Sequence, residues 1–177
     1  MRTVDLDENI IPRKGLSKIK LGDNILLLRP FINSQAKDWA VQLPSSSGRN
    51  LEIPDFIEYS FKQSIYFSVN IYLGIITAIR FSNDFFGAFY RDFGVGSLVG
   101  DLIGEGKLNL QIKGSRLWVE EFDLTLIITN YDQPIDNLVD VGYCSIQSII
   151  MQYPTYHQIP TSENLAKWKI SPLGFKG

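Results

Sequence analysis

The chain has 177 residues, of which 45% are hydrophobic and 12% aromatic, and its formal net charge is −2. This composition excludes a disordered chain and is sufficient to bury a core, so we expect a single domain over residues 1–177, with residues 1–14 as a poorly ordered N-terminal arm. No run approaches the roughly 18 consecutive apolar residues of a membrane helix, and the N-terminus lacks the features of a signal peptide. These absences predict a cytoplasmic protein that does not bind a membrane.

The first expected helix follows the stretch KIKLGDNILLL at residues 18–28. Asp23 follows Gly22 and has a side chain suited to capping the first free N–H groups of a helix. Pro30 lacks the N–H that a helix interior requires. We therefore predict a helix over about residues 24–29 that ends at Pro30.

Three strands are predicted next, at FIEYSF (56–61), SIYFSVN (64–70) and LGIITAIRF (73–81). The second of them alternates apolar and polar side chains with the period of a half-buried strand. The short connections between the three segments predict that they form an antiparallel meander.

The pattern of the first helix returns 74 residues later as FGVGSLVGDLI, at 93–103. Aligning Gly22 with Gly96 also pairs the apolar positions on either side of the two glycines. Ser97 is the expected cap of a second helix, at about 98–103. The repetition suggests a degenerate internal duplication, although any junction of strand, turn and helix can produce such a pattern.

The remaining segments are predicted to be mostly strands. KLNLQIK at 107–113 alternates, Gly114 and Ser115 suit a tight hairpin turn, and RLWVEEFDLTLIITN at 116–130 is expected to be one returning strand. Short helices are expected at 144–151 and at SENLAKWK, 162–169. Together these segments predict an α+β fold, a twisted and mostly antiparallel sheet with two or three short helices on one face.

The sequence offers few groups for catalysis. Cys144 and His157 are the only cysteine and histidine, which excludes an internal disulfide and a metal site made from several such residues. The glycines of GVGSLVG match no phosphate-binding motif and are better explained by helix capping. We expect no catalytic residue, no cofactor and no metal, and the unclustered basic residues do not predict nucleic-acid binding.

Charge is distributed unevenly along the chain. Between Leu117 and Ala166 there is no lysine or arginine, whereas that segment contains seven acidic residues. Such a segment can create a negative field that speeds encounter with a basic partner, and a tyrosine within it suits the centre of an interface. A merely soluble acidic edge is the other interpretation. The predicted partner-binding residues are Glu120, Glu121, Asp123, Tyr131, Asp132, Asp136 and Asp140.

The order of VNIYLGIITAIRFS, FGAFYRDFGVGSLVGDLI and KLNLQIKGSRLWVE resembles a group of small bacterial toxin-immunity proteins, including those of contact-dependent growth inhibition systems. The resemblance covers roughly residues 17–130. It implies a cytoplasmic, non-catalytic protein that binds and neutralises one cognate toxin domain, often a nuclease. We expect such a protein to act by occluding the active site of the toxin. The residues that carry it are Gly74, Ile75, Gly87, Tyr90, Gly94, Gly96, Asp101 and Leu102.

Two other functions remain open at this point. A carbohydrate- or ligand-binding module would use exposed aromatic side chains such as Tyr66, Tyr72 or Trp118. A small cysteine hydrolase would require Cys144 and His157 within hydrogen-bond reach of each other. The sequence does not indicate the oligomeric state.

Overall fold

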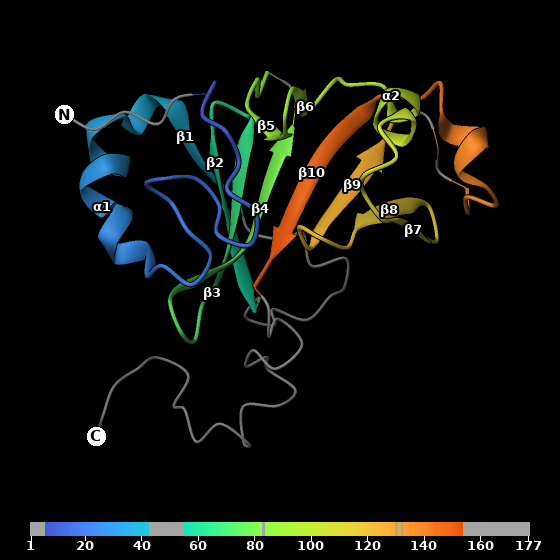
Figure 1. Ribbon diagram of the computed structural model, residues 1–177. Helices are drawn as coiled ribbons and strands as arrows, with labels where there is room; N and C mark the ends of the chain where they lie inside the picture. The colour runs from blue at the N-terminus through green and yellow to red at the C-terminus, as the bar shows by residue number, and fades with distance from the viewer. Residues whose placement is uncertain (1–5, 43–54, 83, 130, 132, 154–177) are drawn as a thin grey trace.

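The computed structural model describes residues 6–42, 55–82, 84–129, 131 and 133–153. Its centre is an eight-stranded sheet in the order β1-β2-β3-β4-β10-β9-β8-β7, in which every neighbouring pair is antiparallel (Figure 1). The strands are β1 (Trp39–Gln42), β2 (Phe56–Phe61), β3 (Ile65–Asn70), β4 (Ile75–Ser82), β7 (Leu110–Lys113), β8 (Arg116–Val119), β9 (Leu124–Ile128) and β10 (Ile146–Gln152). The expected α+β class and mostly antiparallel sheet are confirmed.

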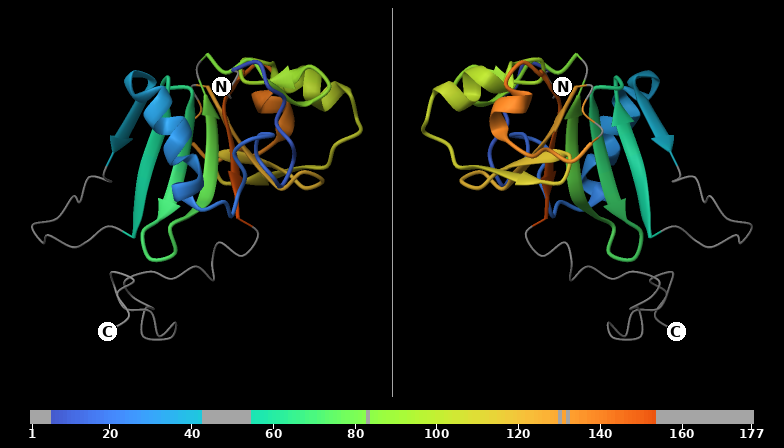
Figure 2. Two further views of the ribbon diagram at one scale, coloured as in Figure 1. Left: turned by 90° about the vertical axis from the view of Figure 1, so that its left-hand side faces the viewer. Right: turned by 90° about the vertical axis from the view of Figure 1, so that its right-hand side faces the viewer.

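Two short helices and a small hairpin complete the described elements. They are α1 (Ile25–Ser34), α2 (Val99–Gly104), the hairpin strands β5 (Ala88–Tyr90) and β6 (Phe93–Gly94), and the 3-10 turns η1 (Ala36–Asp38) and η2 (Leu138–Val141). The sheet is strongly curved, and the N-terminal segment and both helices lie on its concave side (Figure 2). No helix among the described residues is long and apolar enough to cross a membrane.

The strand register explains the core. One row of directly opposed residues runs across seven strands, and a second row lies two residues along. Because successive side chains alternate between faces, both rows point to the concave side. The second row is Phe61, Ile65, Phe81, Ile149, Leu126, Leu117 and Ile112. All of these residues except the half-buried Ile112 are 2% exposed or less.

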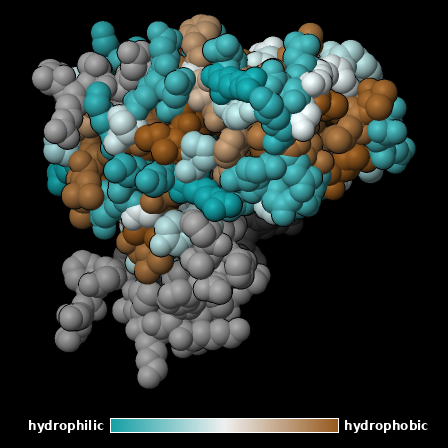
Figure 3. Space-filling model, viewed as in Figure 1, coloured by the Kyte–Doolittle hydropathy of each residue, from teal (hydrophilic) through white to brown (hydrophobic). Residues whose placement is uncertain are grey.

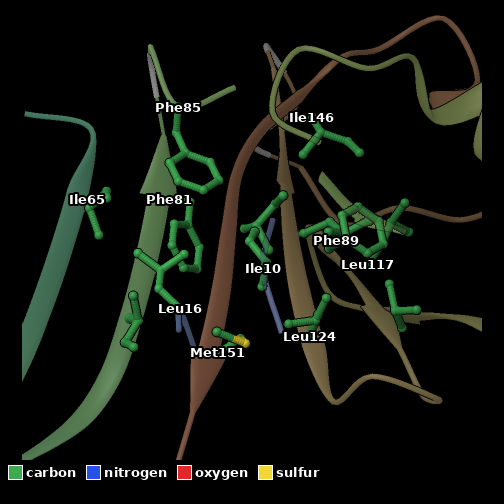
Figure 4. Packing of buried hydrophobic residues seen from close by; sticks show 14 of the residues in the cluster. Ile10, Leu16, Ile65, Phe81, Phe85, Phe89, Leu117, Leu124, Ile146 and Met151 are labelled. Atoms are coloured by element: carbon green, nitrogen blue, oxygen red, sulfur yellow. The ribbon is translucent and has the colours of Figure 1, made fainter. Parts of the chain in front are cut away.

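The N-terminal segment fills the space inside the curve. Ile10 and Leu16 are 3% and 0% exposed and lie between the two halves of the sheet (Figure 4). The N–H of Ile10 donates to the carbonyl of Ala88 at 2.8 Å, which fixes the segment to the β5–β6 hairpin. Residues 6–14 of the expected N-terminal arm are therefore part of the packed structure.

Each helix is joined to the sheet by the same hydrogen bonds. The N–H of Gly22 donates to the carbonyl of Ile76, and the N–H of Gly96 donates to that of Ile146, both at 2.8 Å. The two glycines have φ angles of 84° and 91°, which other residues adopt only with strain. Two further pairs of bonds match. The N–H of Ile76 donates to the carbonyl of Asp23, as that of Ile146 does to Ser97. The N–H of Ile25 donates to the carbonyl of Gly74, as that of Val99 does to Cys144.

The two halves of the sheet correspond as well. Each half contains one β-bulge: Thr77 in β4 has no partner in β3, and Gln147 in β10 has no partner in β9. The two bulges lie at equivalent positions. Under this equivalence Arg80 corresponds to Ile150, and these two residues are direct partners across β4 and β10. A local two-fold axis thus passes between β4 and β10, relating two units of one helix and four strands.

Three expectations about local structure are wrong. The predicted helix at 144–151 is the central strand β10, because a short apolar run between two partner strands forms ladder hydrogen bonds instead. The predicted single strand at 116–130 is a hairpin, β8 and β9, with a turn at 120–123. The predicted helix at 24–29 continues through Pro30 to Ser34. The expected helix at 162–169 lies outside the described residues.

The caps of both helices also differ from the prediction. The capping position of α2 is held by Leu98 instead of Ser97. The cap of α1 is Asn24, whose side chain accepts from the N–H of Leu26 at 2.9 Å. Asp23 accepts instead from the N–H of Lys20, three residues earlier. The helix passes Pro30 because Phe31, the next residue, packs edge-on against Trp39 at the start of β1. Tertiary packing has therefore outweighed the local signal to stop.

Candidate functional site

The predicted acidic residues lie at the two ends of β9. Glu120, Glu121 and Asp123 are in the β8–β9 turn, whereas Asp136 and Asp140 are in the β9–β10 connection. Five strand residues separate the two groups, which corresponds to about 17 Å. The structure therefore forms two acidic clusters in place of one continuous face. Asp132 lies outside the described residues.

The carboxylates of the β8–β9 turn bind their own neighbours. Glu121 accepts from the backbone N–H of Asn109 at 2.8 Å, and Glu120 accepts from the side chains of Asn109 and Gln111. Asp123, with a φ of 55°, accepts from the indole N–H of Trp118 at 3.2 Å. These bonds give the three carboxylates a structural role in joining the turn to β7 and β8.

The carboxylates of the β9–β10 connection are exposed. The side chains of Asp136 and Asp140 form no hydrogen bond or ion pair with the described residues. Between them and β9 lies the half-buried Tyr131. Partial burial, and then the nearby carboxylates of Asp140 and Asp136 together with Tyr143 and Cys144, raise the pKa of the Tyr131 phenol above its ordinary value of 10.0. The phenol therefore stays protonated at neutral pH and can donate a hydrogen bond.

The β9–β10 connection is pressed against α2. The N–H of Gly100 donates to the carbonyl of Gly142 at 2.7 Å, and a Cβ atom at Gly100 would lie only 2.6 Å from the same oxygen. Cys144 accepts from the N–H of Val99, and Ser145 forms a bridge with Leu98. Two segments distant in sequence thus form one surface at this end of the molecule.

Apolar side chains are exposed on this surface. Val139 and Tyr143 are 76% and 77% exposed, and Leu98 is 44% exposed. Figure 3 shows apolar residues reaching the surface at the right of the view, where α2 and η2 lie. The side chains are close to exposed carboxylates, a combination typical of protein-binding surfaces with a polar rim. We call this the α2–η2 surface; it consists of Leu98, Tyr131, Asp136, Val139, Asp140 and Tyr143.

Sequence reasoning identified the tyrosine and the two carboxylates of the α2–η2 surface but missed its apolar members. Val139 and Tyr143 stand within the same base-free segment, where exposed apolar residues alternate with acids. Leu98 occupies the helix-capping position, where a polar residue is the usual choice. The first signal was present in the sequence, whereas the capping position of Leu98 comes from the structure, because Ser97 was the predicted cap.

The aromatic residues proposed for a ligand-binding module are not assembled into one site. Tyr66 and Trp118 share one row of the convex sheet face, but three strands separate β3 from β8, so about 19 Å lies between them. Each ring also faces a cation, Arg80 at 4.0 Å and Lys113 at 3.2 Å from the ring centroid. The hydroxyl of Tyr72 binds Asp55. The two aromatic rings on the sheet therefore do not form a continuous platform.

Cys144 is 6% exposed, so its thiol is largely shielded from solvent. His157 lies outside the described residues, so the structure gives no separation between the two. Among the described residues no group of three or more histidine, cysteine, aspartate or glutamate side chains is arranged to hold a metal ion.

The fold and the α2–η2 surface define an α+β protein with an antiparallel sheet and an exposed acidic and apolar end. Among solved structures, the chain is similar to the crystal structure of the uncharacterized protein yfeY from Escherichia coli, with a TM-score of 0.53 and 11% sequence identity. The similarity covers 81% of this chain and 99% of that one, and at this identity it shows the fold alone. No protein-family model matches the sequence, and a search of curated proteins finds no match.

Proposed function

We propose that the protein is an immunity protein, which binds a cognate bacterial toxin domain in a one-to-one complex and blocks access to its active site. The observation that carries the proposal is the α2–η2 surface, where Val139 and Tyr143 are exposed beside two carboxylates without ion-pair partners among the described residues. The resemblance to toxin-immunity proteins supplies the class of partner. In this proposal the protein is bacterial, cytoplasmic and not an enzyme.

The chemistry of the surface suggests how such a toxin would be held. Nucleases bind a polyanion, and their active-site clefts are therefore basic. Asp136 and Asp140 would meet that positive charge, speed association and mimic the phosphates of the substrate. Val139 and Tyr143 would supply the apolar contact that slows dissociation, because aromatic residues at the centre of an interface contribute most of its affinity.

The first test is calorimetric titration of the full-length protein with the C-terminal domain encoded by the gene immediately upstream, at two salt concentrations. Tight one-to-one binding that weakens with salt is the expected result. Tight binding that salt does not change would keep the immunity function and assign the contact to the apolar residues. No binding would refute the proposed partner.

Two double variants distinguish the acidic clusters. Asp136→Asn with Asp140→Asn removes two charges from the α2–η2 surface, while Glu120→Gln with Glu121→Gln removes two from the β8–β9 turn. The amide oxygens of the glutamines can still accept the hydrogen bonds from Asn109, so the second variant is a matched control for net charge. We expect the first variant to lower the association rate at least tenfold and the second to change it less than threefold. A larger effect of the second variant than of the first would place the binding site at the β8–β9 turn.

We also propose that the two structural units arose by duplication of one ancestral unit. The matched hydrogen bonds of Gly22 and Gly96 and the equivalent extra residues Thr77 and Gln147 support this. A relative whose two halves share clearly detectable sequence identity would test it. Relatives with one unit embedded in an unrelated arrangement of the other would argue against it.

A further inference from the structure

The first structural unit, which contains α1 and β1 to β4, exposes two leucines on α1. Leu26 and Leu27 are 67% and 71% exposed, although the helix packs against the sheet through Leu28, which is 5% exposed. Figure 3 shows apolar residues at the surface on the left of the view, where α1 lies in Figure 1. Two adjacent exposed leucines on a short helix indicate a face that another segment covers.

The internal two-fold axis gives a direct comparison for this face. Leu26 and Leu27 are equivalent to Gly100 and Asp101 of α2. Gly100 is covered by the β9–β10 connection, and Asp101 is an exposed carboxylate. At these two positions the first unit therefore has leucines, whereas the second has a covered glycine and an exposed aspartate.

The described β3–β4 connection does not cover α1 in the way that the β9–β10 connection covers α2. The β9–β10 connection runs over residues 129–145 and includes η2, whereas the equivalent β3–β4 connection has only residues 71–74. As a result the N–H of Leu26 is satisfied by the side chain of Asn24, while that of the equivalent Gly100 is satisfied by the carbonyl of Gly142. The described connection between β3 and β4 is too short to cover α1.

A hollow lies beside the exposed leucines. It has a volume of about 240 Å³ and is lined by Ile25, Leu26, Arg29, Ile32 and Tyr59. Neither the guanidinium of Arg29 nor the hydroxyl of Tyr59 forms a hydrogen bond or an ion pair with the described residues. The walls are thus mainly apolar, with a guanidinium and a phenol available to a carboxylate.

We infer that α1 and this hollow bind a helical turn of another protein, with two apolar side chains three residues apart and a neighbouring carboxylate. The chain itself shows this chemistry in η2, where Leu138 and Val141 are three residues apart and Asp140 stands between them. The apolar side chains pack on Leu26 and enter the hollow that Leu26 lines, and the carboxylate pairs with Arg29. Because leucine replaces glycine at position 26, the bound segment contacts side chains and lies further from the helix axis than η2 does. This inference does not depend on the proposed toxin.

The test uses a peptide with the sequence of residues 134–143, PIDNLVDVGY, acetylated and amidated, as the probe. The full-length ¹⁵N-labelled protein is titrated with it, and backbone amide shifts are followed by NMR. We expect saturable shifts at Leu26, Leu27, Arg29 and Tyr59. Saturation without shifts at these residues, or no saturation up to the solubility limit of the peptide, would overturn the inference.

Three variants test the chemistry of recognition. Arg29→Gln should weaken binding at least fivefold, and Lys37→Gln, which makes the same charge change on exposed η1, should leave it unchanged. Replacing both aspartates of the peptide by asparagine should remove the difference between wild type and Arg29→Gln. Because Arg29 and Lys37 are both exposed, neither change is expected to unfold the protein. Equal effects of Arg29→Gln and Lys37→Gln would refute a specific carboxylate contact.

Discussion

The contact between α2 and the β9–β10 connection predicts that Gly100→Ala is strongly destabilising. An added Cβ would lie 2.6 Å from the carbonyl oxygen of Gly142, so the connection must move by several tenths of an ångström. Overpacking of this kind costs about 1–3 kcal/mol, and weakening the hydrogen bond between the same two glycines costs about 0.5–1.5 kcal/mol more. Replacing glycine by alanine in a helix returns about 0.5–1 kcal/mol. The expected net loss in the free energy of unfolding is about 2 kcal/mol, within a range of about 0.5–4 kcal/mol.

Gly104→Ala is the matched control, because Gly104 is in the same helix and a Cβ atom there meets nothing within 4 Å. It should be neutral or stabilising by up to about 1 kcal/mol. Urea unfolding of both variants, followed by far-UV circular dichroism, measures the difference. The Gly100→Ala protein should also bind its partner more weakly, since the variant displaces η2 and the α2–η2 surface with it. A Gly100→Ala protein as stable as Gly104→Ala would refute the close contact.

The remaining predictions concern the two helix starts, the proline of α1 and the half-buried phenol of Tyr131. Asn24→Ala should cost about 1 kcal/mol in urea unfolding, since it removes the side-chain cap, whereas Leu98→Ala removes no cap and should cost less. Pro30→Ala should raise the free energy of unfolding by up to about 3 kcal/mol, because it restores a helical hydrogen bond; an unchanged midpoint would show that α1 has adapted fully to the proline. Because the pKa of Tyr131 is raised, the unfolded phenol ionises first, so stability should fall as the pH rises past 10. The free energy of unfolding of the Tyr131→Phe variant should fall less steeply than that of the wild type between pH 9 and 11.

The parts of the fold that the sequence predicted well are those where local pattern and tertiary environment agree. The strand at 56–61 was predicted to the residue, and the next two strands nearly so, because β3 alternates buried and half-buried residues over most of its length and short connections pair its neighbours with it. The hairpin turn at Gly114 was also predicted, and its φ of 65° explains why glycine stands there.

The errors occurred where tertiary contacts decide the structure. β10 lies between β4 and β9, is apolar on most of its length, and so shows no clear period that would distinguish a buried strand from a short helix. The turn at 120–123 interrupts a stretch with continuous strand character, and Asp123 adopts a positive φ that a single sequence does not reveal. Its bond with Trp118 is a consequence of the folded hairpin.

The candidate site was predictable in chemistry but not in geometry. A base-free acidic segment is visible in the sequence, but the division of its carboxylates between two ends of β9 depends on the hairpin. The exposure of Val139 and Tyr143 depends on the packing of η2 against α2, a contact between residues about forty positions apart. Composition could therefore suggest a binding surface without locating it.

The internal two-fold axis explains why the two ends of the molecule differ in surface chemistry while sharing a backbone plan. Both units begin with a glycine turn bound to the fourth strand, and their buried helix positions, Leu28 and Leu102, are both leucine. What differs is the connection between the third and fourth strands, which is long and acidic in one unit and short in the other. Loops vary at low cost to a core, because their residues are not required for packing. The long connection therefore adds an acidic surface at one end, and the short one leaves the apolar surface of α1 uncovered at the other.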